Sequence, residues 1–385
     1  MAHTLEMTSY IDKKRYAWLF SVIGPGLALV GTLSVSVFGV GTWILFFPLF
    51  FFYGFVPLLD FCLGEDTNNP PESEVPALES DAYYRAITYA TIPILWVAVI
   101  FNCIFLSTHT LSVWEWLATV ISTGSVLGFG LNVSHELGHK LDFLPRKIAL
   151  FNTALGAYGH FSIEHNRGHH RHVSTAEDPA SSKMGENIYK FACREIPGAA
   201  RRAWRLEADR LSRMGQSAWH PHNEILQALS LTLLVYGTLI WMQGWSMVAV
   251  LVPVALWGAF QLTSANYVEH YGIQRLRNEN GSYETCKPHH SWNSNHWVSN
   301  LVLFQLQRHS DHHTHPSRGY QSLRDFPNLP RLPSGYFGMF FLAYIPPLWY
   351  WVMDPLLVQT VNANSARINF LPSAKKRLME KYAIQ

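Results

Sequence analysis

Long stretches without Asp, Glu, Lys or Arg dominate the hydrophobic pattern of this chain. Residues 16–59 and 225–268 are the longest, and each could form two membrane-spanning helices of ~20 residues. Shorter apolar stretches follow at 86–114 and 116–134, separated only by Glu115. The pattern predicts six transmembrane helices in three hairpins, at residues 17–38, 42–62, 86–108, 113–134, 225–243 and 245–267.

Positively charged residues predict the orientation of these helices. The turns near residues 40, 110 and 244 contain no Lys or Arg, whereas the segment 135–224 is rich in both. Cytoplasmic loops carry the excess of Lys and Arg, and acidic residues count for little. We therefore expect an all-α protein of the inner (cytoplasmic) membrane. Its single domain, residues 1–385, would carry a cytoplasmic helical cap formed by residues 135–224 and 269–385.

A last apolar stretch, residues 332–353, is interrupted by Pro346 and Pro347. Trp349 and its aromatic neighbours cluster at one end of it. Proline breaks a helix, and aromatic residues gather at membrane interfaces. The pattern favours an interfacial or re-entrant segment over a seventh span.

The composition agrees with a membrane protein. Charged residues make up 15% of the chain, against about 25% in soluble domains. The net charge of +2 indicates no nucleic-acid partner. The four cysteines are far apart in the sequence, so no disulfide framework or thiolate metal site is predicted. Histidine is unusually abundant, with 19 residues that cluster.

Nine histidines lie in four short segments on the predicted cytoplasmic side. They are His135, His139, His165, His169, His170, His270, His309, His312 and His313. His135 and His139 are four residues apart, so they share a helix face and can reach one metal ion. His165 and His169 repeat this spacing, which predicts that they share a metal while His170 points toward a neighbouring one. A lone match to H-E-x-x-H, as at His135, would be weak, but four clusters on one side predict a metal site.

The number of imidazoles points to the metal. A catalytic zinc ion takes three protein ligands, whereas nine imidazoles suit two ions with four or five nitrogens each. Imidazole binds iron, copper, nickel and zinc, and redox chemistry at a membrane favours iron. His172 and His315 are candidate additional ligands, whereas His109 lies at an outer turn and cannot reach the site.

Carboxylates stand beside the predicted ligands and are expected to hold imidazole N–H groups. Bridging of two metal ions by a carboxylate stays open as an alternative. The carboxylates are Glu136, Glu164, Asp178, Glu269 and Asp311.

These segments resemble those of the integral-membrane alkane 1-monooxygenases (alkane hydroxylases), in the membrane fatty-acid desaturase and hydroxylase group. The resemblance is carried by the stretches 135–140 (HELGHK), 164–170 (EHNRGHH), 266–272 (NYVEHYG), 306–313 (LQRHSDHH) and 64–71 (GEDTNNPP). It implies that the nine histidines bind two iron ions. It also implies the use of O2 to convert the terminal methyl group of medium-chain linear alkanes to a primary alcohol. The implied electron donor is rubredoxin, itself reduced by a rubredoxin reductase.

Three other functions are alternatives to this one. A membrane fatty-acid desaturase or a xylene-type methyl monooxygenase would use the same kind of site on other substrates. A membrane zinc protease would use His135, Glu136 and His139. A histidine-rich metal transporter would need ionisable residues inside its spans, and the uncharged stretches argue against it.

Two further sets of residues are candidates for substrate and partner contacts. On the second span, Phe50, Phe52 and Tyr53 could close the far end of an alkane channel, or simply face lipid or pack. The chain has no cysteine-rich iron site and no dinucleotide fingerprint, so a separate carrier must supply electrons. An acidic carrier would be attracted to a basic segment, which could instead bind anionic lipid. Its arginines are Arg194, Arg201, Arg202, Arg205, Arg210 and Arg213.

Overall fold

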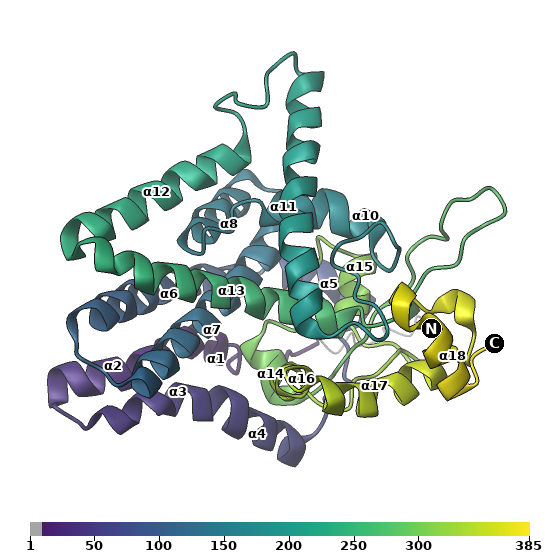
Figure 1. Cartoon of the computed structure of the whole chain (residues 1–385), viewed down its shortest axis with the longest axis horizontal. Helices are drawn as coiled ribbons and strands as arrows, with labels where there is room; N and C mark the ends of the chain where they lie inside the picture. The colour runs from purple at the N-terminus through teal and green to yellow at the C-terminus, as the bar shows by residue number, and fades with distance from the viewer. Residues whose placement is uncertain (1–9) are drawn as a thin grey trace, which may run out of the picture.

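The computed structural model describes residues 10–385, and these form an all-helical molecule (Figure 1). Six helical segments are long and apolar enough to cross a membrane, so the predicted number is confirmed. The segments are Leu19–Phe38 (α1 and α2), Thr42–Leu63 (α3 and α4), Ala82–Thr108 (α6), Val113–Gly138 (α7), Glu224–Gln243 (α12) and Trp245–Glu269 (α13 from Val248). Within the described residues, extended backbone pairs only in isolated bridges.

Glycine and a polar cap set the tight turns between spans. Gly39 ends α2 with a φ of +61°, and Gly244 ends α12 with a φ of +81°. Glycine adopts this left-handed region at little cost. Glu115, the one charged residue between two apolar stretches, forms a capping box with Ser112 at the start of α7.

The helix α7 is the centre of the bundle. In its most apolar stretch 78% of the residues are buried, against 17% in α12, which is the least buried of the six spans. Gly124 on α7 faces Trp257 on α13, and a Cβ added at Gly124 would lie 2.7 Å from the Trp257 Cβ. Small residues allow membrane helices to approach closely. This packing fixes α7 and α13 side by side, with their histidine-bearing ends together.

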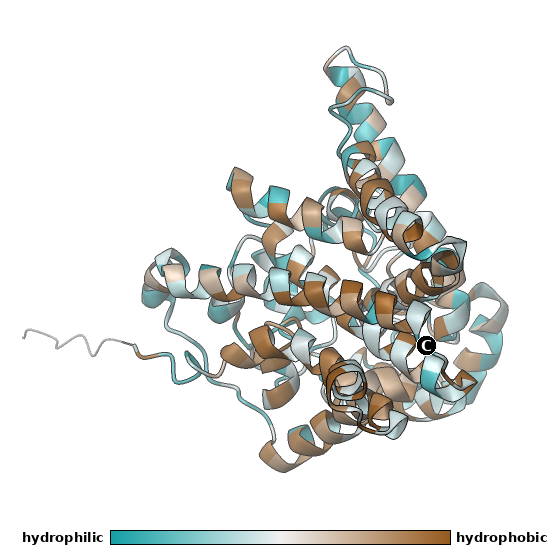
Figure 2. Cartoon of the chain, turned by 90° about the vertical axis from the view of Figure 1, so that its left-hand side faces the viewer, coloured by the Kyte–Doolittle hydropathy of each residue, from teal (hydrophilic) through white to brown (hydrophobic). Residues whose placement is uncertain are grey.

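The long helix α11 and several shorter helices gather at this end of the spans. They are α5 (Val75–Ser80), α8 (Phe143–Leu155), α9 (Phe161–Glu164), α10 (His170–His172), α11 (Ile188–Arg213), α14 (Trp297–Val302), α15 (His309–Thr314) and α18 (Lys375–Tyr382). The helix α11 runs across the direction of the spans and projects beyond the bundle (Figure 1). Figure 2 shows hydrophobic residues concentrated on the bundle helices and a hydrophilic tip beyond α11.

The last apolar stretch forms two helices rather than one. The helices α16 (Tyr336–Ala343) and α17 (Pro346–Thr360) meet at an angle of 118°. The break falls directly before Pro346 and Pro347, as the sequence predicts. A single straight seventh span is therefore excluded, and re-entry into the membrane stays a prediction.

Candidate functional site

All nine histidines of the four segments come together as two groups. The first group is His135, His139, His165, His170 and His312, and the second is His169, His270, His309 and His313. Within each group the candidate ligand nitrogens all lie within 4.8 Å of one another. Each group could hold one metal ion, with five and four imidazoles respectively.

The nitrogen atoms face one another in a way that fits a bound cation. The Nε2 atoms of His135 and His312 are 2.8 Å apart, and those of His313 and His309 are also 2.8 Å apart. His169 Nε2 is buried and has no hydrogen-bond partner among the described residues. Buried polar atoms normally have a partner. Metal ions at the two centres would satisfy these nitrogens, so the residues fit a two-metal site.

The protonation states of the rings also suit metal binding. Burial lowers the pKa well below its usual value in His139, His165, His170, His270, His309, His312 and His313. Neighbouring imidazoles contribute to the same shift. These rings are therefore neutral near pH 7, and the neutral imidazole is the form that binds metals.

The pairing predicted for the second histidine segment is wrong. His165 shares its group with His170, their Nε2 atoms being 3.0 Å apart, whereas His169 belongs to the other group. The reason is a π-helical turn at His165–His169, in which hydrogen bonds join residues five apart. Residues five apart therefore lie on one face here, rather than residues four apart.

The fourth span extends further than its apolar pattern predicts. The helix α7 continues to Gly138, so His135 lies inside its last turn and His139 is its C-cap. His135 and His139 share a group, as their spacing predicts. In α15, His309 and His313 are four residues apart and share the second group, whereas His312 points into the first.

Among the four carboxylates next to the histidine segments, only Glu269 faces a grouped histidine. Its Oε2 lies 3.3 Å from His309 Nε2, and its Oε1 is buried without a hydrogen-bond partner in the described chain.

The other three carboxylates pair with basic residues instead. Glu136 binds Lys140 at 2.7 Å, and Glu164 contacts Arg202. Asp311 accepts from Arg318 at 3.2 Å and lies 2.9 Å from His315 Nδ1. The structure therefore places Glu136, Glu164 and Asp311 in ion pairs that brace the helices around the histidines.

Asp178 is the carboxylate that contacts the Nδ1 atom of a grouped histidine, His169. Its Oδ2 lies 3.0 Å from His169 Nδ1, and its Oδ1 accepts from Arg202 at 2.7 Å. Burial alone would lower the pKa of His169, but the charge and hydrogen bond of Asp178 outweigh burial and raise it. A proton on Nδ1 fixes the tautomer and leaves Nε2 free to bind a metal.

Other histidines lie outside the two groups. His172 pairs with Glu177. His109 stacks on Phe105 at the C-terminal end of α6, away from the histidine groups. A smaller group, Glu284, His289 and His290, lies in the loop between α13 and α14, with His290 fully buried. Arg367 and Lys287 contact the Glu284 carboxylate, so its charge is already compensated.

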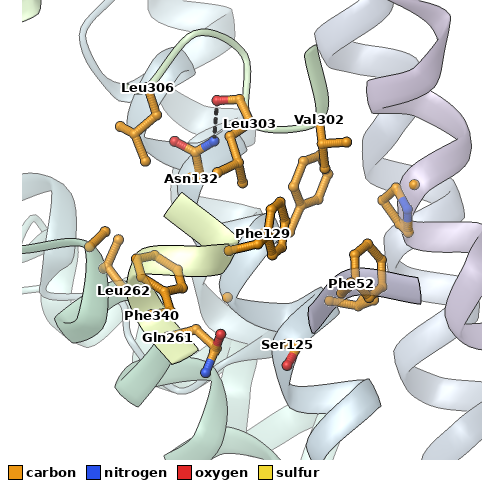
Figure 3. Close-up of a pocket in the computed structure, with 16 residues that line it drawn as sticks. Phe52, Ser125, Phe129, Asn132, Gln261, Leu262, Val302, Leu303, Leu306 and Phe340 are labelled. Atoms are coloured by element: carbon orange, nitrogen blue, oxygen red, sulfur yellow. Dashed lines mark hydrogen bonds between the residues drawn. The ribbon is translucent and has the colours of Figure 1, made fainter. Parts of the chain in front are cut away.

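An apolar pocket lies inside the bundle (Figure 3). The centre of a water-sized sphere can occupy about 40 Å³ inside it. Its walls are Gly24, Pro25, Phe52, Ser125, Val126, Gly128, Phe129, Asn132, Gln261, Leu262, Ala265, Val302, Leu303, Leu306, Phe337 and Phe340. Asn132 is one helical turn before His135, and Leu306 is three residues before His309. One end of the pocket therefore lies next to both histidine groups.

The predicted channel residues take three different positions. Phe52 lines the pocket and stacks on Phe337, with ring centroids 5.7 Å apart. Tyr53 lies behind the wall and donates to Gln261 at 2.7 Å. Phe50 is 68% exposed on the lipid-facing side and does not reach the pocket.

The basic segment also divides in two. Arg194 binds Glu186, Arg202 binds Glu164 and Asp178, and Arg210 binds Glu207. The exposed arginines are Arg201, Arg205 and Arg213. Because they are spaced by multiples of four, they lie along one stripe of α11 together with the exposed Asp209, and we call the three arginines the arginine stripe.

Comparison with known proteins identifies the family. The family model described as fatty acid desaturase matches residues 111–343. Alkane 1-monooxygenase 1 of Alcanivorax borkumensis is 49% identical over 98% of this chain and 93% of its own length. The alkane 1-monooxygenase of Pseudomonas putida is 50% identical over 97% of this chain and 92% of its own. The chain belongs to the alkane 1-monooxygenase family.

Membership in the alkane 1-monooxygenase family makes the protein an oxidoreductase of the monooxygenase class. A more distant relative is the xylene/toluene monooxygenase hydroxylase component of Pseudomonas putida, 30% identical over 57% of this chain. The four histidine segments, read from sequence, thus predicted the family correctly. The family and the histidine groups together imply a metal cofactor.

Proposed function

We propose that this protein hydroxylates the terminal methyl group of medium-chain linear alkanes to primary alcohols, using O2 and electrons from rubredoxin. The observation that carries the proposal is the apolar pocket, whose wall residues Asn132 and Leu306 each lie three residues before a grouped histidine. A hydrocarbon dissolved in the membrane can bind there with its end at the metal centre. The full-length relatives named alkane 1-monooxygenase support the same substrate class.

The two histidine groups would hold two iron ions. When bound, the iron supplies the reduction of O2 and the insertion of one oxygen atom into a C–H bond. The nine imidazoles would hold the metals, and Asp178 would orient His169 through its Nδ1. Glu269 points its carboxylate toward the four-histidine group, where it can accept a proton or bind the metal.

The pocket positions the substrate and excludes water. An alkane has no polar group to bind, so contacts worth ~0.8 kcal/mol per CH2 group hold it in place. Shape alone then selects the terminal carbon. Phe52, on the pocket wall, and Tyr53, behind it, limit the space for the tail of the chain.

The electron donor would dock on the arginine stripe of α11. Rubredoxin, reduced in turn by a rubredoxin reductase, would approach from the cytoplasm at the inner membrane. The three exposed arginines attract an acidic carrier, and salt would weaken the attraction. In this arrangement the spans form three hairpins of one domain, and residues 135–224 and 269–385 form the cytoplasmic cap.

Product analysis tests the substrate class. The iron-loaded, rubredoxin-coupled protein is given octane, xylene and an acyl lipid in parallel. We expect 1-octanol as the main product. Methylbenzyl alcohol alone would favour the xylene-type function that the distant relative suggests, and an unsaturated lipid would favour a desaturase. Peptide cleavage with one zinc ion per chain would favour the protease.

Single histidine variants test the ligand roles. His312→Ala removes a member of the five-histidine group and His270→Ala a member of the four-histidine group. Both should lower bound iron and abolish hydroxylation. The control His109→Ala should change neither the iron content nor the activity, because His109 lies at the C-terminal end of α6, away from the histidine groups. Full iron content and activity in both His270→Ala and His312→Ala would contradict the assignment.

A further inference from the structure

Polar side chains close the end of the pocket that is remote from the histidines. Ser125 and Gln261 line this end, at the bottom of Figure 3, opposite Asn132. Along α7, Ser125 precedes His135 by ten residues, or ~15 Å of helix. A linear chain with one end at the histidines would therefore bring its other end to Ser125 and Gln261.

These side chains form one hydrogen-bonded network across four segments. Tyr53, from the second span, donates to Gln261 Oε1 at 2.7 Å. Gln261 Nε2, on α13, donates to the Tyr344 hydroxyl at 2.8 Å, and Tyr344 is the C-cap of α16. The hydroxyls of Tyr53 and Ser125, on α7, are 3.2 Å apart. We call Tyr53, Ser125, Gln261 and Tyr344 the polar end wall.

The polar end wall resists displacement more strongly than the rest of the pocket. It lies at membrane depth, where no water replaces a broken hydrogen bond and an unpaired polar group is costly. An apolar tail that pushed past Gln261 would separate it from both tyrosines. Phe129 and Phe340, on the apolar walls, can change rotamer without losing such bonds.

We propose that the polar end wall is the tail stop of the pocket. It sets the longest linear chain that can bring its terminal methyl group to the histidines, and Gln261 and Tyr344 are specificity-determining residues. The inference deepens the proposed function and rests on it. The polar end wall, held by hydrogen bonds between four segments, thus limits chain length in addition to Phe52.

Competition between alkanes measures the tail stop directly. The purified, iron-loaded full chain receives an equimolar mixture of linear alkanes of increasing length, and the ratios of the alcohols are measured. Ratios within one mixture do not depend on the amount of active enzyme. Tyr344→Ala should move the profile to longer chains, by about fourfold per CH2 group newly accommodated. Tyr344→Phe keeps the ring but loses the bond to Gln261, so its shift should be about threefold.

A matched variant controls for general loosening of the bundle. Tyr236 lies on α12 outside the pocket, and its hydroxyl donates to the Leu155 carbonyl at 2.9 Å. Tyr236→Ala therefore removes the same side chain and also one hydrogen bond at membrane depth. Its product profile should match that of the parent protein.

A binding measurement separates the tail stop from the proposed reaction. A ligand that binds the folded state raises the melting temperature, so alkanes of increasing length should stabilise the parent protein up to a cut-off. The cut-off should lie at longer chains in Tyr344→Ala. If the parent makes no alcohol but the cut-off still moves, the proposed function fails and the tail stop stands. The inference would be overturned if Tyr344→Ala left both the product ratios and the cut-off unchanged. If Tyr344→Ala does not fold, the same result in Tyr344→Phe would overturn it.

Discussion

Replacing Asp178 by Asn should weaken one metal position and spare the other. Asp178 is 2% exposed, and its carboxylate lies between His169 Nδ1 at 3.0 Å and Arg202 at 2.7 Å. Without the Asp178 charge, Glu164 alone compensates Arg202, so more positive charge faces His169 and the metal. Losing such a partner typically reduces metal affinity 10- to 100-fold, or about 1.4–2.8 kcal/mol. His169 belongs only to the four-histidine group, so the loss should be confined to that group.

Iron content and Mössbauer spectroscopy would measure this effect. After dialysis against a weak chelator, the parent should keep iron in both groups, whereas Asp178→Asn should approach one iron ion per chain. In 57Fe-loaded protein one of two spectral components should fade and the other persist. Asp209→Asn, an exposed aspartate on α11, is the matched control and should behave as the parent. Equal loss of both components, or no loss at all, would refute the assigned role of Asp178.

Two other substitutions test the pocket and the docking face. Phe52→Leu removes part of the aromatic side chain of Phe52, which is 6% exposed and lines the pocket. The ratio of long-chain to short-chain alcohols should rise several-fold. An unchanged ratio would exclude Phe52 from chain-length selection. Charge reversal at Arg201 and Arg205 should raise the half-saturating rubredoxin concentration about tenfold at low salt, without changing iron content. If neither that concentration nor its salt dependence changes, the stripe binds lipid and the carrier docks elsewhere. Arg202 should not be included, because it binds Asp178.

The sequence predicts which histidines gather, but not how all of them are divided. Six transmembrane helices and four histidine segments follow directly from residue type and spacing. The division depends on backbone detail, because the π-helical turn at His165–His169 exchanges the partners expected from an α-helical spacing. Sequence spacing does not reveal such a turn.

The partners of the carboxylates are likewise set by tertiary packing. Glu136, Glu164 and Asp311 adjoin the histidines in sequence, yet they bind Lys140, Arg202 and Arg318. Three of the six arginines of the basic segment form such ion pairs, and a count of charges along the sequence does not reveal these partners. The polar end wall also escapes prediction, because its four members come from segments far apart in the chain.

The most direct test of the proposed chemistry is a single turnover with metal analysis. Protein with iron in both histidine groups is reduced without oxygen, mixed with octane and then exposed to O2. We expect up to one molecule of 1-octanol per chain, and none from protein loaded with zinc instead. Full alcohol formation by the zinc-loaded protein, or no alcohol from protein that holds iron in both groups, would contradict the proposed chemistry.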